Sequence, residues 1–161
     1  MTSTPRLSPR CLKDPVHLLA LGFGSGLAPV APGTAGTLLA VLPAWLIAAW
    51  PWPTRLGLVA LLFALGVWIC GESARRLGVH DHPAIVWDEI VGYLAVCLAA
   101  PSGPVWLAAA FVLFRFFDIV KPWPIRDVDH SLSGGIGIML DDLIAAAFGA
   151  ACLLLYQYFF P

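Results

Sequence analysis

Long stretches without any charged side chain limit the possible folds of this chain more than any other feature of its sequence. Four such stretches occupy residues 16–54, 56–71, 90–114 and 143–161. A membrane-spanning helix needs about 20 mostly apolar residues, whereas about a quarter of the residues of an ordinary soluble domain are charged. Only 12% of the 161 residues are charged here and 60% are apolar. This composition argues against an ordinary soluble domain and excludes a disordered chain.

Proline and glycine residues divide the uncharged stretches into candidate membrane helices. We expect five, at about 35–50, 56–71, 86–100, 105–118 and 143–160. Several are short for a complete span, which tilt or a locally thin bilayer can accommodate. The predicted fold class is all-α, a polytopic membrane helical bundle. Residues 1–161 form one domain in this prediction, and residues 1–15 form a cytosolic N-terminal arm.

The charged residues collect on one face of this topology. Of the basic residues, 8 of 9 lie before the first span, between the second and third, or between the fourth and fifth, and all 10 acidic residues lie in or beside the same segments. Only Arg55 is on the other side. Cytosolic loops are rich in Lys and Arg, so we expect the charged face in the cytosol. A net charge of −1 offers no basic surface, and no nucleic-acid partner is expected.

Glycine and proline residues interrupt the first uncharged stretch over residues 17–37 and predict a short helix followed by a re-entrant or interfacial loop. One interpretation is an anion cradle. In it, the hydroxyls of Ser25, Thr34 and Thr37 and the N–H groups of glycines such as Gly33 face a phosphate near a helix N-terminus. The other is a close-packed turn of small residues between helices. The segment alone leaves both open.

Two further segments place paired acids at the border of apolar helices. Asp88 and Glu89 begin the third candidate span, and Asp141 and Asp142 follow a glycine-rich turn that leads into the last one. Such acids can simply cap a helix N-terminus. A divalent cation is the better reason for crowding them, because it offsets their repulsion. The loop residues His80, Asp81 and His82 are possible accessory groups.

A fourth polar segment combines cations with an acid at the end of an apolar helix. Arg115, Asp118 and Lys121 recur every three residues and therefore share one helical face, which Pro122 terminates. Charges at membrane depth are costly, so these groups are expected to line a polar site. Anchoring by snorkelling cations would explain Arg115 and Lys121 but leaves Asp118 without a role. Arg126 is a further candidate phosphate ligand in this segment, and Asp129 is a possible accessory residue.

Together, these segments predict one site for a metal and a phosphate ester at the cytosolic interface. The candidate metal ligands are Asp88, Glu89, Asp118, Asp141 and Asp142, a set of oxygen donors that suits Mg²⁺ or Mn²⁺ better than zinc. Such a metal polarises a phosphoryl oxygen and acidifies a bound water, while Arg and Lys neutralise phosphate oxygens. The site's place at the membrane surface suits a lipid phosphate.

The same segments resemble the bacterial phosphatidylglycerophosphatase A family. The resemblance runs in order from about His17 to Ala147 and rests on five motifs: LLALGFGSGLAP (18–29), PGTAGT (32–37), VHDHPAIVWDE (79–89), FRFFDIVKPWPIR (114–126) and GGIGIMLDD (134–142). It implies a multi-pass enzyme of the bacterial inner (cytoplasmic) membrane that requires Mg²⁺. This enzyme would hydrolyse phosphatidylglycerophosphate to phosphatidylglycerol and inorganic phosphate, the last step of phosphatidylglycerol synthesis and upstream of cardiolipin.

Within this expectation the acidic residues and the cations have separate roles. Asp88, Glu89, Asp141 and Asp142 hold one or two Mg²⁺ ions, with Asp118 as a further ligand or base. The phosphate-binding candidates are Arg115, Lys121, Arg126, Ser25, Gly33 and Thr34, and Lys121 is also counted with the five acids as catalytic. Direct attack by water and a phospho-aspartate intermediate both remain possible. The alternative function is a small membrane transporter or channel with a cytosolic cation or phosphate site, against which the nearly charge-free spans argue. Nothing in the sequence predicts an oligomeric state.

Overall fold

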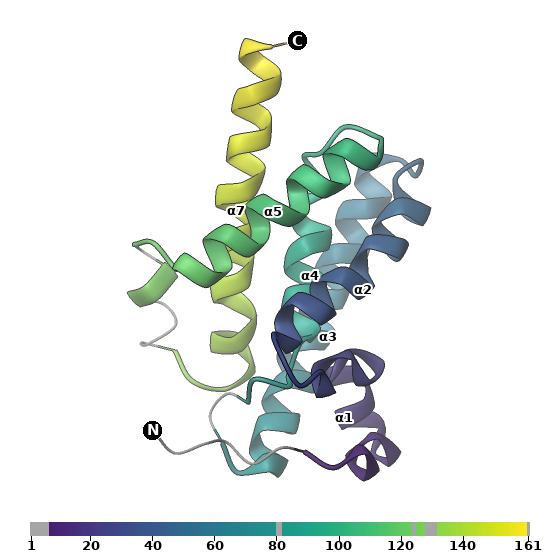
Figure 1. The fold of residues 1–161 in the computed structure, drawn as a ribbon, viewed down its shortest axis with the longest axis vertical. Helices are drawn as coiled ribbons and strands as arrows, with labels where there is room; N and C mark the ends of the chain where they lie inside the picture. Colours follow the sequence, from purple (N-terminus) through teal and green to yellow (C-terminus); the bar gives the residue numbers. More distant parts are fainter. Residues whose placement is uncertain (1–6, 80–81, 124, 128–131, 161) are drawn as a thin grey trace.

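Helices form every regular element in the part of the chain that the structure describes, residues 7–79, 82–123, 125–127 and 132–160 of a computed structural model. The N-terminal part contains the 3₁₀ helix η1 (Pro9–Lys13), α1 (Pro15–Ala20) and the 3₁₀ helix η2 (Gly22–Leu27). Five longer helices follow: α2 (Pro32–Ile47), α3 (Trp52–Leu77), α4 (Trp87–Val96), α5 (Pro104–Val120) and α7 (Gly134–Phe159). Each of the five predicted segments overlaps one of these helices, and the all-α prediction is confirmed (Figure 1).

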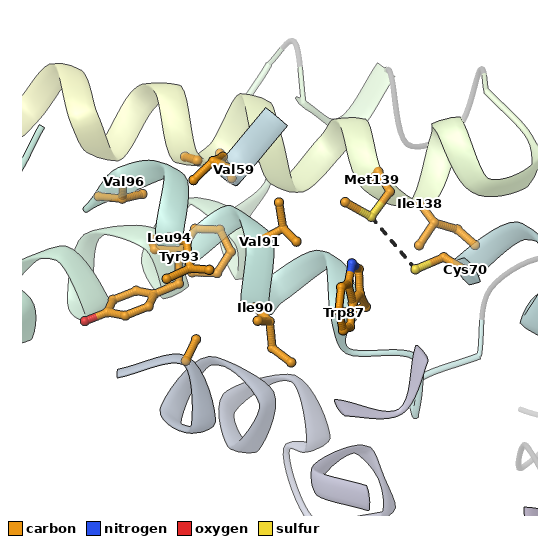
Figure 2. Close-up of a cluster of buried hydrophobic side chains, with 14 of the residues drawn as sticks. Val59, Cys70, Trp87, Ile90, Val91, Tyr93, Leu94, Val96, Ile138 and Met139 are labelled. Carbon is orange, nitrogen blue, oxygen red and sulfur yellow. Dashed lines mark hydrogen bonds between the residues drawn. The ribbon is translucent and has the colours of Figure 1, made fainter. Parts of the chain in front are cut away.

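The short helix α4 lies at the centre of the bundle. It packs against α2, α3, α5 and α7, and side chains all around it are buried, among them Trp87, Val91, Tyr93 and Val96 (Figure 2). A helix that is apolar on every side is a core helix. The acidic residues of its first turn are thereby carried into the interior of the protein.

The two longest helices, α3 and α7, pack along each other and have the length and composition of membrane-crossing helices. Each has 26 residues and therefore a length of about 39 Å, more than a hydrocarbon core of about 30 Å requires. The 16 residues of α2, the 17 of α5 and the 10 of α4 are fewer than the usual 20. Many large apolar side chains on the surface of the bundle are exposed, as in a membrane protein.

The start of α7 differs from the sequence-based expectation. We expected a flexible glycine turn before a span that begins near residue 143, and this was wrong, because α7 already begins at Gly134. Gly135 lies so close to α3 that a Cβ atom there would overlap the Val67 carbonyl oxygen. Small residues allow helix backbones to approach each other, so this glycine serves helix packing.

Replacing Gly135 with alanine should therefore destabilise the bundle. Forcing a methyl group against the α3 backbone is expected to lower the free energy of unfolding by about 2 kcal/mol. Thermal unfolding in detergent measures the loss. Gly57→Ala is the matched control, since a Cβ at Gly57 would have no neighbour within 4 Å. Equal melting temperatures for the two variants would contradict the close contact between α3 and α7.

The N-terminal segment packs against the bundle and is tied to the end of α3. Asp14 caps α1 through the Val16 N–H (2.9 Å) and pairs with Arg76 (2.5 Å), which also pairs with Glu72 (2.7 Å). The hydrogen bond from the Val16 N–H and the pairing with Arg76 keep the pKa of Asp14 below its usual value. The short helix expected in this region is confirmed as α1.

Candidate active site

A pocket of about 300 Å³ lies where α2, α4, α5 and α7 come together. Its walls carry five carboxylates and two cations: Asp88, Glu89, Asp118, Asp141, Asp142, Arg115 and Lys121. These residues belong to three of the four polar segments of the sequence, and the fourth segment contributes Ala31, Pro32 and Gly33 at the start of α2. The predicted convergence of the four segments in one place is thus what the structure shows.

Three of the carboxylates in the lining form a compact cluster. Asp88 and Glu89 lie in the first turn of α4, and Asp142 faces them from α7. One oxygen from each of the three lies within 4.8 Å of the others. Glu89 Oε2 and Asp142 Oδ2 are buried and accept no hydrogen bond from the described residues. Buried carboxylate oxygens without a donor are unfavourable unless a cation compensates them.

Arg115 lies beside this cluster on α5. Its Nη1 atom is 2.5 Å from Asp118 Oδ2, one helical turn further along α5, and 3.8 Å from Glu89 Oε1. The three side chains are only 12–14% exposed. Salt bridges between groups as enclosed as these depend on close geometry, because both partners lose most of their hydration. Asp118 therefore orients the guanidinium at the edge of the acidic cluster.

Lys121 and Asp141 form a second ion pair in the lining of the pocket. Lys121 ends α5 in the left-handed conformation, with φ of 44°, and its Nζ atom is 2.6 Å from Asp141 Oδ2. The termination of the helix directly before Pro122 agrees with the prediction. Because of this backbone turn, the Lys121 side chain reaches α7 at the rim of the pocket.

The balance of charge explains what the pocket can hold. Its five carboxylates and two cations leave a formal excess of three negative charges. Asp118 and Asp141 make the two shortest ion pairs with the cations, and Asp88, Glu89 and Asp142 form the cluster, of which Glu89 also lies 3.8 Å from Arg115. The cluster offers only carboxylate oxygens, the donors that Mg²⁺ and Mn²⁺ prefer. These three residues fit a hard divalent cation, and the neighbouring Arg115 and Lys121 fit an anion beside it.

The N-terminus of α2 forms the remaining wall. Ala31, at φ of 48°, turns the chain sharply into the helix, and Pro32 supplies its first residue without an N–H group. The N–H groups of Gly33 and Thr34 have no acceptor within the helix. A Cβ atom at Gly33 would overlap Glu89 Oε1 and lie 3.2 Å from Arg115 Nη1. Only a glycine at this position lets the helix end come so close to the charged residues.

Several predicted residues do not line the pocket. The Ser25 hydroxyl donates to the Gly22 carbonyl (2.9 Å) and stabilises a turn, Thr34 is half-buried outside the lining, and Arg126 is exposed. Thr37 is buried and donates to the Gly33 carbonyl (2.9 Å). His82 is buried and accepts a hydrogen bond from the Ala84 N–H (3.1 Å). The remaining accessory candidates, His80, Asp81 and Asp129, lie outside the described residues.

Some residues that shape the site carry no chemical signal in the sequence. Ala31 and Ile85 line the pocket, and no chemical pattern marks them in the sequence. Pro32 does carry a signal, because proline is favoured in the first turn of a helix and thus indicates that α2 begins before residue 35. The buried His17, whose Nδ1 is 2.9 Å from the Ser73 hydroxyl, joins α1 to α3 away from the pocket.

Comparison with known proteins agrees with the earlier resemblance. The family model described as Phosphatidylglycerophosphatase A matches residues 18–157. The chain is 44% identical over 152 residues to phosphatidylglycerophosphatase A of Escherichia coli (strain K12), with 93% of this chain and 88% of that protein covered. It is 47% identical over 163 residues to phosphatidylglycerophosphatase A of Haemophilus influenzae, with 98% of each covered. No solved structure gives a significant match. The chain therefore belongs to the phosphatidylglycerophosphatase A family.

Proposed function

We propose that this protein is a lipid phosphatase that hydrolyses phosphatidylglycerophosphate to phosphatidylglycerol and inorganic phosphate. The relatives that share 44–47% of its residues carry the name of this activity. The single structural observation that supports it best is the cluster of Asp88, Glu89 and Asp142 beside Arg115. Clustered oxygen ligands next to a guanidinium are suited to a phosphate monoester with its metal ion.

Asp88, Glu89 and Asp142 would hold the metal, which we propose to be Mg²⁺. When bound, it would offset the charge of the acids and polarise a phosphoryl oxygen. Asp118 and Asp141 lie closer to the cations of the pocket: Asp118 is 2.5 Å from Arg115 and Asp141 is 2.6 Å from Lys121, whereas Glu89 is 3.8 Å from Arg115. We therefore assign Asp118 and Asp141 to positioning Arg115 and Lys121, with Asp118 also near enough to the cluster to serve as a base.

The protein's own groups would bind and orient the phosphate. Arg115 can donate two hydrogen bonds to it, Lys121 adds a charge at the rim, and the N–H groups of Gly33 and Thr34 point from the positive end of α2. Hydrolysis forms a P–O bond to water and breaks the bond to the glycerol oxygen. The water gives up a proton in this step, and Asp118 is the proposed acceptor. The glycerol oxygen takes a proton as it leaves, and Asp118, which has accepted the proton of the water, can return it, so that one water is consumed overall.

The arrangement in the membrane follows from the position of the charges. We propose a multi-pass protein of the bacterial inner membrane whose pocket opens at the cytosolic interface. The acids and cations of the pocket and the ion pairs of Asp14, Glu72 and Arg76 belong to the segments predicted to be cytosolic. In this arrangement α4 is enclosed by the other helices, so its length of 10 residues need not match the bilayer.

Phosphate release from phosphatidylglycerophosphate in mixed micelles tests the function directly. The purified protein should release phosphate with Mg²⁺, and excess EDTA should abolish the release until Mg²⁺ is restored. Phosphatidic acid and glycerol 3-phosphate in parallel reactions measure selectivity for the lipid headgroup. No release from any lipid phosphate would overturn the proposed function. Undiminished release in EDTA would overturn only the metal assignment.

A further inference from the structure

An apolar groove runs along the surface between α2 and α5. Leu38, Val41 and Trp45 line it from α2, and Ala108, Phe111 and Val112 line it from α5. We call this the α2–α5 groove; its volume is about 310 Å³. No charged side chain is among its lining residues.

The groove exists because the two helices pack mainly on other elements. The main neighbour of α2 is α4 and that of α5 is α7, with few contacts between α2 and α5 themselves. Ala108 adds only a methyl group to the wall, so space remains between the helices. Leu38, Trp45 and Val112 are each about 60% exposed, which is costly in water but favourable against hydrocarbon.

The same two helices connect the groove to the active-site pocket. They lie antiparallel, since Gly33 near the start of α2 adjoins Arg115 near the end of α5, while Trp45 and Pro104 line the groove together at the far end. Val112 precedes Arg115 by three residues, about 4.5 Å along α5, and Leu38 follows Gly33 by five, about 7.5 Å along α2. The groove thus begins about one helical turn from the phosphate-binding groups. Beyond Trp45, a further hollow of about 260 Å³ continues it toward Ser102 and Gly103.

We propose that one acyl chain of the lipid substrate lies in the α2–α5 groove while its terminal phosphate is bound at Arg115. This inference rests on the proposed function. The terminal phosphate of this lipid is joined to its two acyl chains through a glycerol, a phosphodiester and a second glycerol, so the chains need an apolar surface that begins a short distance from the pocket. The α2–α5 groove starts there and follows the helices away from the charged end of the bundle. The groove is therefore a specificity element for the lipid part of the substrate.

The test fills the groove without touching the charged pocket. Ala108→Trp places a large side chain between α2 and α5 at an exposed position. For phosphatidylglycerophosphate with long acyl chains, we expect the kcat/KM of this variant to fall about tenfold, mainly through a higher KM. The reason is that the bound acyl chain loses apolar contact area in the filled groove. Hydrolysis of an analogue with two-carbon acyl chains should remain at the wild-type rate, which also shows that the variant is folded. Ala60→Trp, at an exposed position of α3 outside the groove, is the matched control and should resemble wild type with both substrates.

Photolabelling provides a readout that does not depend on turnover. A phosphatidylglycerophosphate with a diazirine in one acyl chain should label α2 between residues 38 and 45 and α5 between residues 108 and 112. Unlabelled phosphatidylglycerophosphate should suppress these adducts, and Ala108→Trp should lose them. Equal effects of Ala108→Trp and Ala60→Trp, or labelling that the competitor leaves unchanged, would overturn the groove assignment. Failure of wild type to hydrolyse either substrate would instead count against the proposed function.

Discussion

Asp142→Asn is expected to lower the rate of phosphatidylglycerophosphate hydrolysis about a thousandfold. The substitution keeps the size of the side chain and removes one negative charge from the cluster with Asp88 and Glu89. A catalytic divalent cation contributes several kcal/mol of transition-state stabilisation, and about 4 kcal/mol corresponds to a thousandfold in rate. Phosphate release at saturating substrate and Mg²⁺ measures the change.

Asp14→Asn is the control for this prediction. Asn is as good a helix N-cap as Asp, and the pair with Arg76 is an exposed surface salt bridge far from the pocket lining, so activity should remain at the wild-type level. Binding of Mn²⁺, followed by electron paramagnetic resonance, separates metal loss from unfolding. Asp142→Asn should bind Mn²⁺ at least about tenfold more weakly, whereas Asp14→Asn should bind it normally. Wild-type turnover and Mn²⁺ affinity in Asp142→Asn would show that Asp142 does not hold the metal.

The meeting of the charged residues in one pocket could be predicted from the sequence. Charged side chains near a membrane interior are energetically costly, so acids and cations at the ends of apolar helices are expected to share a polar site. The prediction named Asp88, Glu89, Asp118, Asp141 and Asp142, and all five line the pocket. The all-helical fold could also be predicted, because long apolar runs between proline and glycine residues favour helices in a membrane.

The pairing of individual groups could not be predicted, because it depends on how the helices pack. Periodicity places Arg115, Asp118 and Lys121 on one face of α5, but it does not reveal that Lys121 reaches Asp141 on α7. The prediction of Arg126 as a phosphate ligand rested on its nearness in sequence to Lys121. The structure places it on the exposed side of the turn that follows α5.

The structural roles of the glycines could not be predicted either, because glycine occurs both in flexible turns and at close contacts between helices. Gly134, Gly135 and Gly137 were interpreted as a flexible turn, whereas in the structure they lie in the first turn of α7, and Gly135 packs against α3. The glycines at 22–26 suggested an anion cradle, and Gly26 instead lies directly against the Ala84 carbonyl. Backbone contacts of this kind involve residues far apart in sequence and leave no local pattern.

Gly33→Ala is expected to lower phosphatase activity by at least about a hundredfold. The new methyl group would overlap Glu89 Oε1 and press on Arg115 Nη1, so Glu89 must leave its place in the carboxylate cluster. Displacement of a catalytic group by about 1 Å can cost a hundredfold in rate. Alanine is a better helix former than glycine, so the helix α2 itself should persist. Phosphate release and circular dichroism of the purified variant measure the two effects separately.

Gly57→Ala makes the same chemical change at a helical position with no neighbour within 4 Å and should leave activity at the wild-type level. The combined variant Gly33→Ala/Glu89→Asp adds a sharper test, because the shorter acid withdraws its carboxylate from the new methyl group. If steric displacement of Glu89 causes the loss, the combined variant should be more active than Gly33→Ala alone, although Glu89→Asp by itself lowers activity. Such non-additivity is expected for residues that contact each other or share one network, whereas distant, independent sites give additive effects. Full activity of Gly33→Ala, or strictly additive losses in the double variant, would contradict the close approach of the α2 N-terminus to Glu89.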